Sequence, residues 1–408
     1  MLPTSAEPLP RAAEQPAAPP ATVRVSVVMP CLNERDTIGP CITRALAALA
    51  AAGLPGEVIV ADNGSTDGSV EIAQALGARV VHQEVRGYGA AYMKGIATAQ
   101  GEYILMGDSD STYDFMDLPR LIAPLQQGYD LVMGSRFMGQ ILPGAMPWAN
   151  RYIGNPVLTG MLNLLFKQRI SDAHSGLRAF TRTAYERMQL RTTGMEFASE
   201  MVIKASMARL KITEVPITYH PRGGVSKLSP LGDGWRHVRF MLLFSPSYLF
   251  LLPGVIAMVV GLLVTSVLVR GPFYLGGFYV GIHYMIVGSL LAVLGQQMVS
   301  FGLSARVFAT SEHFVGRDRW VEGFMRYYSL ERGLVIGGVL GAVGLATFIY
   351  ILVQWLAGDV RFNDLIHLHE AIAASTLMIM GVQLVAASFF LSLLELHWQT
   401  RADPATAE

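Results

Sequence analysis

The stretch that decides the fold is Gly107-Asp108-Ser109-Asp110-Ser111-Thr112-Tyr113-Asp114. It follows a short apolar run, Tyr103–Met106, which predicts a buried strand. Two carboxylates at the end of such a strand cannot both enter the core, because burying an unpaired charge is too costly. We therefore expect Asp108 and Asp110 where open α/β sheets bind ligands, at the carboxyl ends of the strands. There they suit a hard divalent cation, Mg²⁺ or Mn²⁺, shared with substrate phosphates.

Strands and helices alternate around this stretch, which predicts an α/β fold with a mainly parallel, doubly wound sheet. The expected strands, besides Tyr103–Met106, are Val23–Pro30, Glu57–Ala61 and Arg79–His82. Helices are expected between them, over 37–52, 69–76 and 87–99. Polar loops then follow the carboxyl ends of several strands, so they all line one rim of the sheet. An isolated Asp-x-Asp pair is more often a turn or a cap, and this shared rim is what favours a site.

The second half of the chain predicts an α-helical transmembrane domain. Of the 408 residues 52% are hydrophobic, and the apolar residues concentrate after about residue 246. Four segments there approach the roughly 20 residues that a membrane helix needs: Ser247–Val269, Phe278–Phe301, Leu334–Leu356 and Glu370–Leu394. Because few charges fall inside them, we expect four spans within 247–396 rather than four buried soluble helices.

The expected order of domains is a disordered N-terminus over 1–22, a catalytic domain over 23–229, an amphipathic juxtamembrane helix over 230–246, the spans, and a tail over 397–408. The N-terminus is rich in Ala and Pro and has no apolar signal core. The loop after the second span carries five arginines, whereas the loop after the third carries only Arg361. The positive-inside rule then predicts an integral protein of the cell (inner) membrane whose catalytic domain and termini are cytoplasmic.

Two further segments are expected to lie in the membrane interface. The stretch Pro147–Phe166 is apolar, with Arg151 as its single charge. A crossing there would separate Asp108 from Arg178, so we expect an interfacial helix, with a core helix as the alternative. In Leu231–Phe244, apolar residues alternate with Arg and His, a pattern that suits anionic lipid.

The motifs of the first half occur in a characteristic order along the chain. They are Pro-x-x-Asn-Glu from Pro30, Asp-Asn-Gly-Ser-x-Asp from Asp62, Gly-x-Gly-x-Ala from Gly87, Asp-Ser-Asp from Asp108, Gly-Ser-Arg from Gly134, Asp-Ala-His-Ser-Gly-Leu-Arg from Asp172, and Arg-Gly-Gly-Val-Ser-Lys from Arg222. This order resembles the inverting family 2 glycosyltransferases of the GT-A fold. Within that family it is similar to the polyprenyl-phosphate hexose synthases, such as dolichol-phosphate mannose or glucose synthase. The resemblance covers roughly residues 25–244.

The resemblance implies a donor site for a UDP- or GDP-hexose. Asp110 is the implied metal ligand, and Asp108 shares the metal or bonds the donor. The other implied donor-site residues are Pro30, Asn33, Glu34, Asp62, Gly87, Gly89, Arg222 and Lys227. The two glycines would let the backbone approach the nucleotide at a helix N-terminus. For Asp62 the alternative is a residue that only shapes a turn.

The resemblance also implies an acceptor site for a polyprenyl phosphate. Arg136 and Arg178 would hold its phosphate, with the Ser175 hydroxyl as a further donor, because the planar guanidinium matches phosphate oxygens. A phosphate monoester is largely dianionic at neutral pH, so a strong general base is not required. Asp172 is expected to orient the acceptor or to act as a weak base. Glu196 and Glu200 are further candidates for that role.

These observations favour an enzyme that moves one hexose to a polyprenyl phosphate with inversion. A glycolipid synthase with a hydroxyl acceptor and a processive polysaccharide synthase are enzyme alternatives. A lipid-linked sugar flippase formed by the spans is an alternative from another class. The expected partners are the nucleotide sugar, the lipid phosphate and the membrane, with a homo-oligomer allowed and no nucleic acid. The cysteines Cys31 and Cys41 are expected to be reduced and packed.

Overall fold

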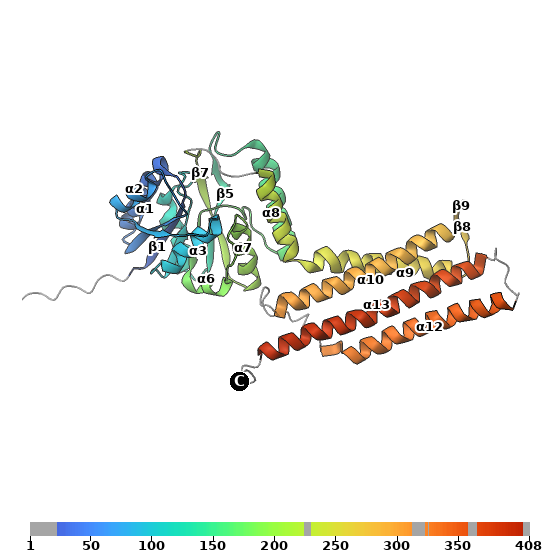
Figure 1. The fold of residues 1–408 in the computed structure, drawn as a ribbon. Coiled ribbons are helices and arrows are strands. Elements are labelled where there is room, and N and C mark those ends of the chain that lie inside the picture. The colour runs from blue at the N-terminus through green and yellow to red at the C-terminus, as the bar shows by residue number, and fades with distance from the viewer. Residues whose placement is uncertain (1–22, 224–229, 312–322, 325, 358–364, 403–408) are drawn as a thin grey trace, which may run out of the picture. The chain divides into compact units, whose positions relative to one another are not determined.

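The computed structural model describes residues 23–223, 230–311, 323–324, 326–357 and 365–402 (Figure 1). The predictions for segment 1–22, Lys227 and residues 403–408 therefore lie outside the described residues. Contacts divide the described chain into two compact units. The first unit holds 23–151, 174–198 and 210–223, and the second holds 152–173, 199–209 and the described residues from 230 onward.

The first unit is built on a seven-stranded sheet with the order β3-β2-β1-β4-β6-β5-β7. Its strands are β1 Val25–Cys31, β2 Gly56–Asp62, β3 Arg79–His82, β4 Tyr103–Met106, β5 Leu131–Ile141, β6 Arg178–Thr181 and β7 Ile212–Tyr219. Strands β1 to β4 pair in parallel, as do β5 and β7. Strand β6 is antiparallel to both β4 and β5. The mainly parallel sheet predicted from the alternation of elements is confirmed, with β6 as its antiparallel exception.

Helices pack around the sheet of the first unit, and the bounds of α1, α2 and α3 lie close to those of the three predicted helices. The helices of this unit are α1 Arg35–Ala51, α2 Ser69–Ala75, α3 Tyr88–Thr98, the short η1 Phe115–Asp117, α4 Leu118–Gln126, α6 Arg182–Met188 and the first turn of α7 Phe197–Met207. The central strands β1 and β4 are buried along almost their whole length, as expected for strands that are covered on both faces.

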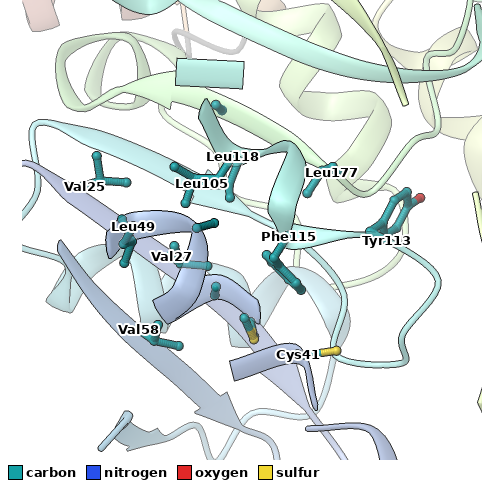
Figure 2. Packing of buried hydrophobic residues seen from close by; sticks show 14 of the residues in the cluster. Val25, Val27, Cys41, Leu49, Val58, Leu105, Tyr113, Phe115, Leu118 and Leu177 are labelled. Carbon is teal, nitrogen blue, oxygen red and sulfur yellow. The ribbon is translucent and has the colours of Figure 1, made fainter. Parts of the chain in front are cut away.

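A continuous hydrophobic core joins the sheet to α1 and α4 (Figure 2). Val27 of β1 and Leu105 of β4 are fully buried, and they pack in one cluster with Leu118 of α4. Phe115 and Leu177 belong to the same cluster and extend it to the carboxyl ends of the strands. Burying such side chains contributes about 1.5–3 kcal/mol each, which keeps the rim loops on a rigid base.

The second unit contains four helices long and apolar enough to cross a membrane. They cover Ser247–Leu268, Ile282–Thr310, Leu330–Leu356 and His367–Leu394, within the elements η3 Ser247–Leu251, α9 Leu252–Leu268, α10 Ile282–Ser311, α12 Leu330–Leu356 and α13 Leu365–Ala402. A hairpin of β8 Phe273–Leu275 and β9 Phe278–Val280 joins α9 to α10.

Small residues let these helices approach one another closely. A Cβ added at Gly261 of α9 would lie 2.2 Å from the main-chain nitrogen of Ala292 in α10. One added at Gly337 of α12 would lie 2.8 Å from the carbonyl of Gly381 in α13. The polar side chains of the bundle pair across helices, as in the 2.6 Å hydrogen bond between Ser289 and Thr376. Such contacts are those that hold helices together in lipid.

The two segments expected at the interface also belong mainly to the second unit. The first forms η2 Asn150–Gly154 and α5 Asn155–Phe166, and the second forms α8 Pro230–Leu243, which packs on α5. Helix α5 continues directly from η2, and among the described residues this segment is not one of the helices long and apolar enough to cross a membrane. Its Val157 and Leu164 are 60% and 67% exposed, and Trp235 of α8 is 62% exposed. This apolar surface agrees with an interfacial position, which stays a prediction.

Candidate active site

The loops that follow β1 and β2 are tied together by Asn33. Its backbone adopts a positive φ of 52°, which Asn tolerates better than most residues. The side-chain oxygen of Asn33 accepts a 2.8 Å hydrogen bond from the Thr66 amide, and the Asn33 amide donates to the Ser65 hydroxyl at 3.0 Å. The predicted donor-site residue Asn33 therefore lies at the rim and shapes it.

Asp62, at the end of β2, is almost completely buried, and it organises the turn after that strand. Its carboxylate accepts hydrogen bonds from the amides of Gly64 and Ser65 at 3.1 and 3.0 Å, and it lies 3.2 Å from Nδ1 of His82. Burial opposes ionisation, but the hydrogen bonds from Ser65, Gly64 and His82 outweigh it and hold the pKa of Asp62 below its usual value. These contacts are the turn-shaping role left open by the sequence, and a contact from Asp62 to a nucleotide base stays a prediction.

Asn63 connects this turn to the next loop, a role that sequence reasoning missed. Its side-chain oxygen accepts a 2.7 Å hydrogen bond from the Gly87 amide. Its side-chain nitrogen donates to the carbonyls of Gln83 and Val85, both at 2.9 Å. A polar residue next to a turn is ordinary in sequence, so only the distant partners reveal Asn63 as a link between loops.

The structure gives Gly87 and Gly89 a packing role that the sequence did not indicate. A Cβ at Gly87, whose φ is +148°, would lie 2.2 Å from the carbonyl oxygen of Thr193, and one at Gly89 would lie 2.2 Å from that of Thr192. The amide of Ala90 donates to Thr193 at 3.1 Å. The space on the Cβ side of both glycines is therefore filled by the protein's own backbone, and a contact from their backbone to the nucleotide stays a prediction. They are needed so that the segment before α7 can dock on the start of α3.

Asp108 is held from several directions. Its Oδ1 accepts hydrogen bonds from the phenols of Tyr88 and Tyr92, each at 3.0 Å. A Cβ at Gly176 would lie 2.6 Å from its Oδ2, so Gly176 packs directly against the carboxylate. Burial, reinforced by the neighbouring charge of Asp110, raises the pKa of Asp108 to about 6, against opposing effects of the two phenols. The Asp108 carboxylate is therefore surrounded by the two phenols and Gly176 and does not belong to a solvated turn.

Asp110 lies in a cluster of charges at the same rim. Its Oδ1 accepts a hydrogen bond from the Thr112 amide at 3.1 Å, and Nε of Arg222 lies 3.4 Å from its Oδ2. Nη2 of Arg222 also lies 3.4 Å from Oε1 of Glu34. Ser109 links this loop to β1 by donating to the Pro30 carbonyl at 2.6 Å. The structure thus brings together Pro30, Glu34, Asp110 and Arg222 as the sequence predicted.

The residues predicted for the acceptor differ in their surroundings. Arg136 is nearly buried, and its guanidinium lies over the ring of Tyr219, 5.1 Å from the centroid. Arg178 is completely buried, and it donates to the carbonyls of Ser175 at 2.8 Å and Ala198 at 2.7 Å. The hydroxyl of Ser175 is buried and has no hydrogen-bond partner within the described residues. A buried hydroxyl in this condition is costly unless a ligand satisfies it.

The acceptor motif approaches Asp108 through β6. Arg178 is in register with Met106, two residues before Asp108. Burial raises the pKa of the Tyr88 phenol well above its usual value. The negative charge of Asp108 raises this pKa further, whereas the positive charge of Arg178 lowers it. Arg178 and the acidic loop are therefore neighbours in the first unit.

The three carboxylates considered as orienting groups or bases are divided between the two units. Asp172 belongs to the second unit and is completely buried. Glu200, also in the second unit, forms a 2.9 Å ion pair with Lys204, and both side chains are buried. Glu196 belongs to the first unit, and one of its carboxylate oxygens is buried without a hydrogen-bond partner in the described part of the chain.

The donor set fits a divalent cation that is completed by substrate. No cluster of three or more His, Cys, Asp or Glu side chains suited to a metal occurs among the described residues. Oδ1 of Asp108 accepts hydrogen bonds from two phenols, and Oδ1 of Asp110 accepts one from the Thr112 amide. The Oδ2 atom of each carboxylate is therefore the candidate metal ligand. Mg²⁺ is commonly bound by one or two carboxylates together with phosphates and water, and this arrangement matches that requirement.

Comparison with known proteins agrees with the fold and the motifs. The chain matches the model described as "Glycosyl transferase family 2" over residues 26–189 and "Glycosyltransferase family 2 C-terminal transmembrane region" over 303–395. The low-salt glycan biosynthesis hexosyltransferase Agl6 of Haloferax volcanii is 43% identical over 90% of this chain and 88% of its own length. A dolichyl-phosphate hexose transferase of the same organism is 34% identical over 52% of this chain and 89% of its own length.

The chain is also similar to solved structures, among them the following enzyme. Glucosyl-3-phosphoglycerate synthase of Mycobacterium tuberculosis, in complex with Mn²⁺, UDP and glucosyl-3-phosphoglycerate, is 27% identical, with a TM-score of 0.44, over 55% of this chain and 80% of that chain. The match to Agl6 extends over nearly the whole of both proteins. The predicted resemblance is confirmed: the chain is a membrane protein that belongs to glycosyl transferase family 2.

Proposed function

We propose that this glycosyltransferase moves one hexose from UDP-glucose or GDP-mannose to a polyprenyl phosphate, with inversion at the anomeric carbon. The observation that carries the proposal is the packing of Gly176, in the acceptor motif, against Oδ2 of Asp108. It places the segment that ends in Arg178 beside the acidic loop at the end of β4. A phosphate held by that segment would lie close to a sugar held at the acidic loop.

On the donor side, the rim residues Pro30, Asn33, Glu34 and Asp62 would hold the nucleoside. Arg222, and Lys227 beyond it in the chain, would bind the diphosphate, because guanidinium and ammonium groups pair with phosphate oxygens. The backbone at Gly87 and Gly89 would approach the nucleotide at the start of α3, and both glycines also allow the segment before α7 to pack against that start.

Asp110 and Asp108 would hold Mg²⁺ or Mn²⁺ through their Oδ2 atoms. The ion would neutralise the negative charge that develops on the departing nucleoside diphosphate. Tyr88 and Tyr92 keep Asp108 in place by donating to its other oxygen.

On the acceptor side, Ser175, Arg136 and Arg178 would fix the lipid phosphate. A phosphate oxygen would form the bond to the anomeric carbon as the bond to the nucleoside diphosphate breaks. Because the attacking phosphate is already a dianion, no proton has to be removed in this step. Asp172, three residues before Ser175 in the chain, would orient the acceptor segment.

The lipid acceptor requires a site at the membrane surface, because a long isoprenoid does not leave the bilayer. The exposed apolar side chains of α5 and α8 suit such a position. The similarity to a dolichyl-phosphate hexose transferase supports the same acceptor class. We propose that the first unit faces the cytoplasm, as the arginines between α10 and α12 indicate.

The test is to incubate the full-length protein in membranes with labelled UDP-glucose or GDP-mannose, each with and without polyprenyl phosphate. A labelled lipid that is labile to mild acid and appears only with the phosphate acceptor is the expected result. Labelled lipid that resists mild acid, or that forms equally well with a polyprenol, would contradict a phosphate acceptor. If label is transferred from neither UDP-glucose nor GDP-mannose, both proposed donors are contradicted.

A further inference from the structure

We propose that Arg222 competes with the divalent cation for Oδ2 of Asp110, and that the nucleoside diphosphate ends the competition by binding both. The inference rests on the proposed metal and donor site, and it adds an antagonism between two groups of that site. It predicts that removing one positive charge strengthens metal binding while it weakens nucleotide binding.

The competition follows from how the two oxygens of Asp110 are used. Oδ1 accepts hydrogen bonds from both the amide and the hydroxyl of Thr112. Oδ2 is the remaining ligand atom, and Nε of Arg222 lies 3.4 Å from it. A cation that coordinates Oδ2 would therefore have a guanidinium as a close neighbour of like charge.

Arg222 is poorly satisfied where it lies, so it can give way. Its Nε is buried and has no hydrogen bond within the described residues, although it is close enough to Asp110 for an ion pair. Its contact to Glu34 is also long, at 3.4 Å. Short, well-directed bonds would hold the guanidinium firmly, whereas two contacts of this length leave it free to turn to a better acceptor.

The backbone at this position is fixed, so any movement belongs to the side chain. The amide of Gly223 donates to the carbonyl of Asp110 at 3.1 Å, and the amide of His220 donates to that of Thr112 at 2.9 Å. A Cβ at Gly223 would lie 2.7 Å from the methyl group of Thr37, which shows how closely the segment packs. The Arg222 guanidinium therefore stays within reach of Asp110 in any rotamer that turns toward the rim.

The balance of charge explains why a diphosphate resolves the conflict. Glu34, Asp108 and Asp110 are three carboxyl groups, and Arg222 is the cation that the structure places among them. A divalent ion added next to Arg222 meets repulsion, but a diphosphate offers oxygen atoms to both. The expected result is that cation and nucleotide bind with positive cooperativity, and that this cooperativity depends on Arg222.

The experiment measures Mn²⁺ binding to the purified full-length protein, from the EPR signal of free Mn²⁺, without nucleotide. Arg222→Gln should tighten Mn²⁺ binding by about three- to tenfold, the range expected for loss of a partly buried charge neighbour. Arg222→Lys, which keeps the charge, should stay near the wild-type affinity. The same Arg222→Gln protein should bind UDP and GDP more weakly, by calorimetry with Mn²⁺ present.

Arg120→Gln is the matched control, because it removes the same charge from an ion pair with Asp117 of η1, at 2.8 Å, and should leave Mn²⁺ binding unchanged. Unchanged or weaker Mn²⁺ binding by a folded Arg222→Gln protein would overturn the proposal, and so would equal tightening in Arg222→Lys. Asp110→Asn separates the two levels of the argument. If it abolishes Mn²⁺ binding while Arg222→Gln has no effect, the metal site stands and only the competition fails. If the wild type binds no Mn²⁺ with or without nucleotide, both fail.

Discussion

Gly89 offers a direct test of whether the glycines at the start of α3 serve packing or nucleotide binding. In Gly89→Ala the added carbon would lie 2.2 Å from the carbonyl oxygen of Thr192 and 2.9 Å from Cβ of Phe197. Neither neighbour is the end of a flexible side chain, so backbone would have to move. The ring of Phe197 stacks on Tyr92, which in turn holds Asp108, so the movement would also reach the acidic loop.

The expected magnitude follows from two opposing effects. Overpacking of this kind costs about 1–3 kcal/mol, and a clash with backbone belongs at the upper end. Replacing a helical glycine by alanine returns up to about 1 kcal/mol of helix propensity. The net loss is about 2 kcal/mol, which for a domain of this size lowers the melting temperature by about 4–8 °C.

The assay is thermal unfolding of the full-length protein in detergent, followed by near-ultraviolet circular dichroism. Gly160→Ala is the matched control, because Gly160 lies inside α5 and its added carbon would have nothing within 4 Å. That variant should melt at or above the wild-type temperature. An unchanged melting temperature in Gly89→Ala, together with a higher Michaelis constant for the nucleotide sugar, would refute the packing argument and restore the nucleotide explanation.

Three further outcomes are expected. Asp110→Asn should abolish metal-dependent transfer, and activity that persists in this variant or in EDTA-treated wild type would contradict the metal assignment. Arg136→Ala should raise the Michaelis constant for polyprenyl phosphate more than that for the nucleotide sugar. Arg178→Ala should also lower the melting temperature, because it removes two hydrogen bonds to main-chain carbonyls, worth about 0.5–1.5 kcal/mol each. Equal effects on both substrates, or a normal melting temperature for the second variant, would count against these roles. The pKa of Asp62 is lowered in the folded protein, so its contribution to stability is complete above the pKa of the unfolded chain, about 4, and is lost as the pH falls through the folded pKa. The difference in melting temperature between wild type and Asp62→Asn should therefore be constant from pH 7 to about 5 and should close toward pH 3. A difference that does not depend on pH would contradict this linkage.

Local patterns were sufficient for the first four strands of the sheet, the helices between them and the membrane helices, but β5, β6 and β7 were not predicted. The predicted strand Tyr103–Met106 has the same bounds in the structure, and helix α1 begins and ends within two residues of the expected 37–52. The four spans were found as well, although α10 and α12 begin or end several residues from the expected limits. Such features depend on hydrophobic runs and periodicity, which are properties of neighbouring residues.

The relations between distant segments could not be predicted in the same way. The antiparallel β6 separates β4 from β5, and its register with β4 places the end of the acceptor motif beside the acidic loop. Nothing in the residues of Arg178–Thr181 indicates the direction of that strand. The ion pairs of Arg222 and the link formed by Asn63 likewise join residues far apart in the chain.

By itself, the sequence determined the class of fold, the membrane helices and which loops carry the polar residues, since each follows from composition and spacing over short stretches. Only the tertiary structure decided how those residues are used. It showed that Gly87 and Gly89 accommodate protein backbone, that Arg178 is buried against main-chain carbonyls, and that Gly176 supports Asp108. The physical reason is that these contacts depend on strand register and on packing between segments far apart in the chain, such as β4 and β6, and no local pattern encodes either.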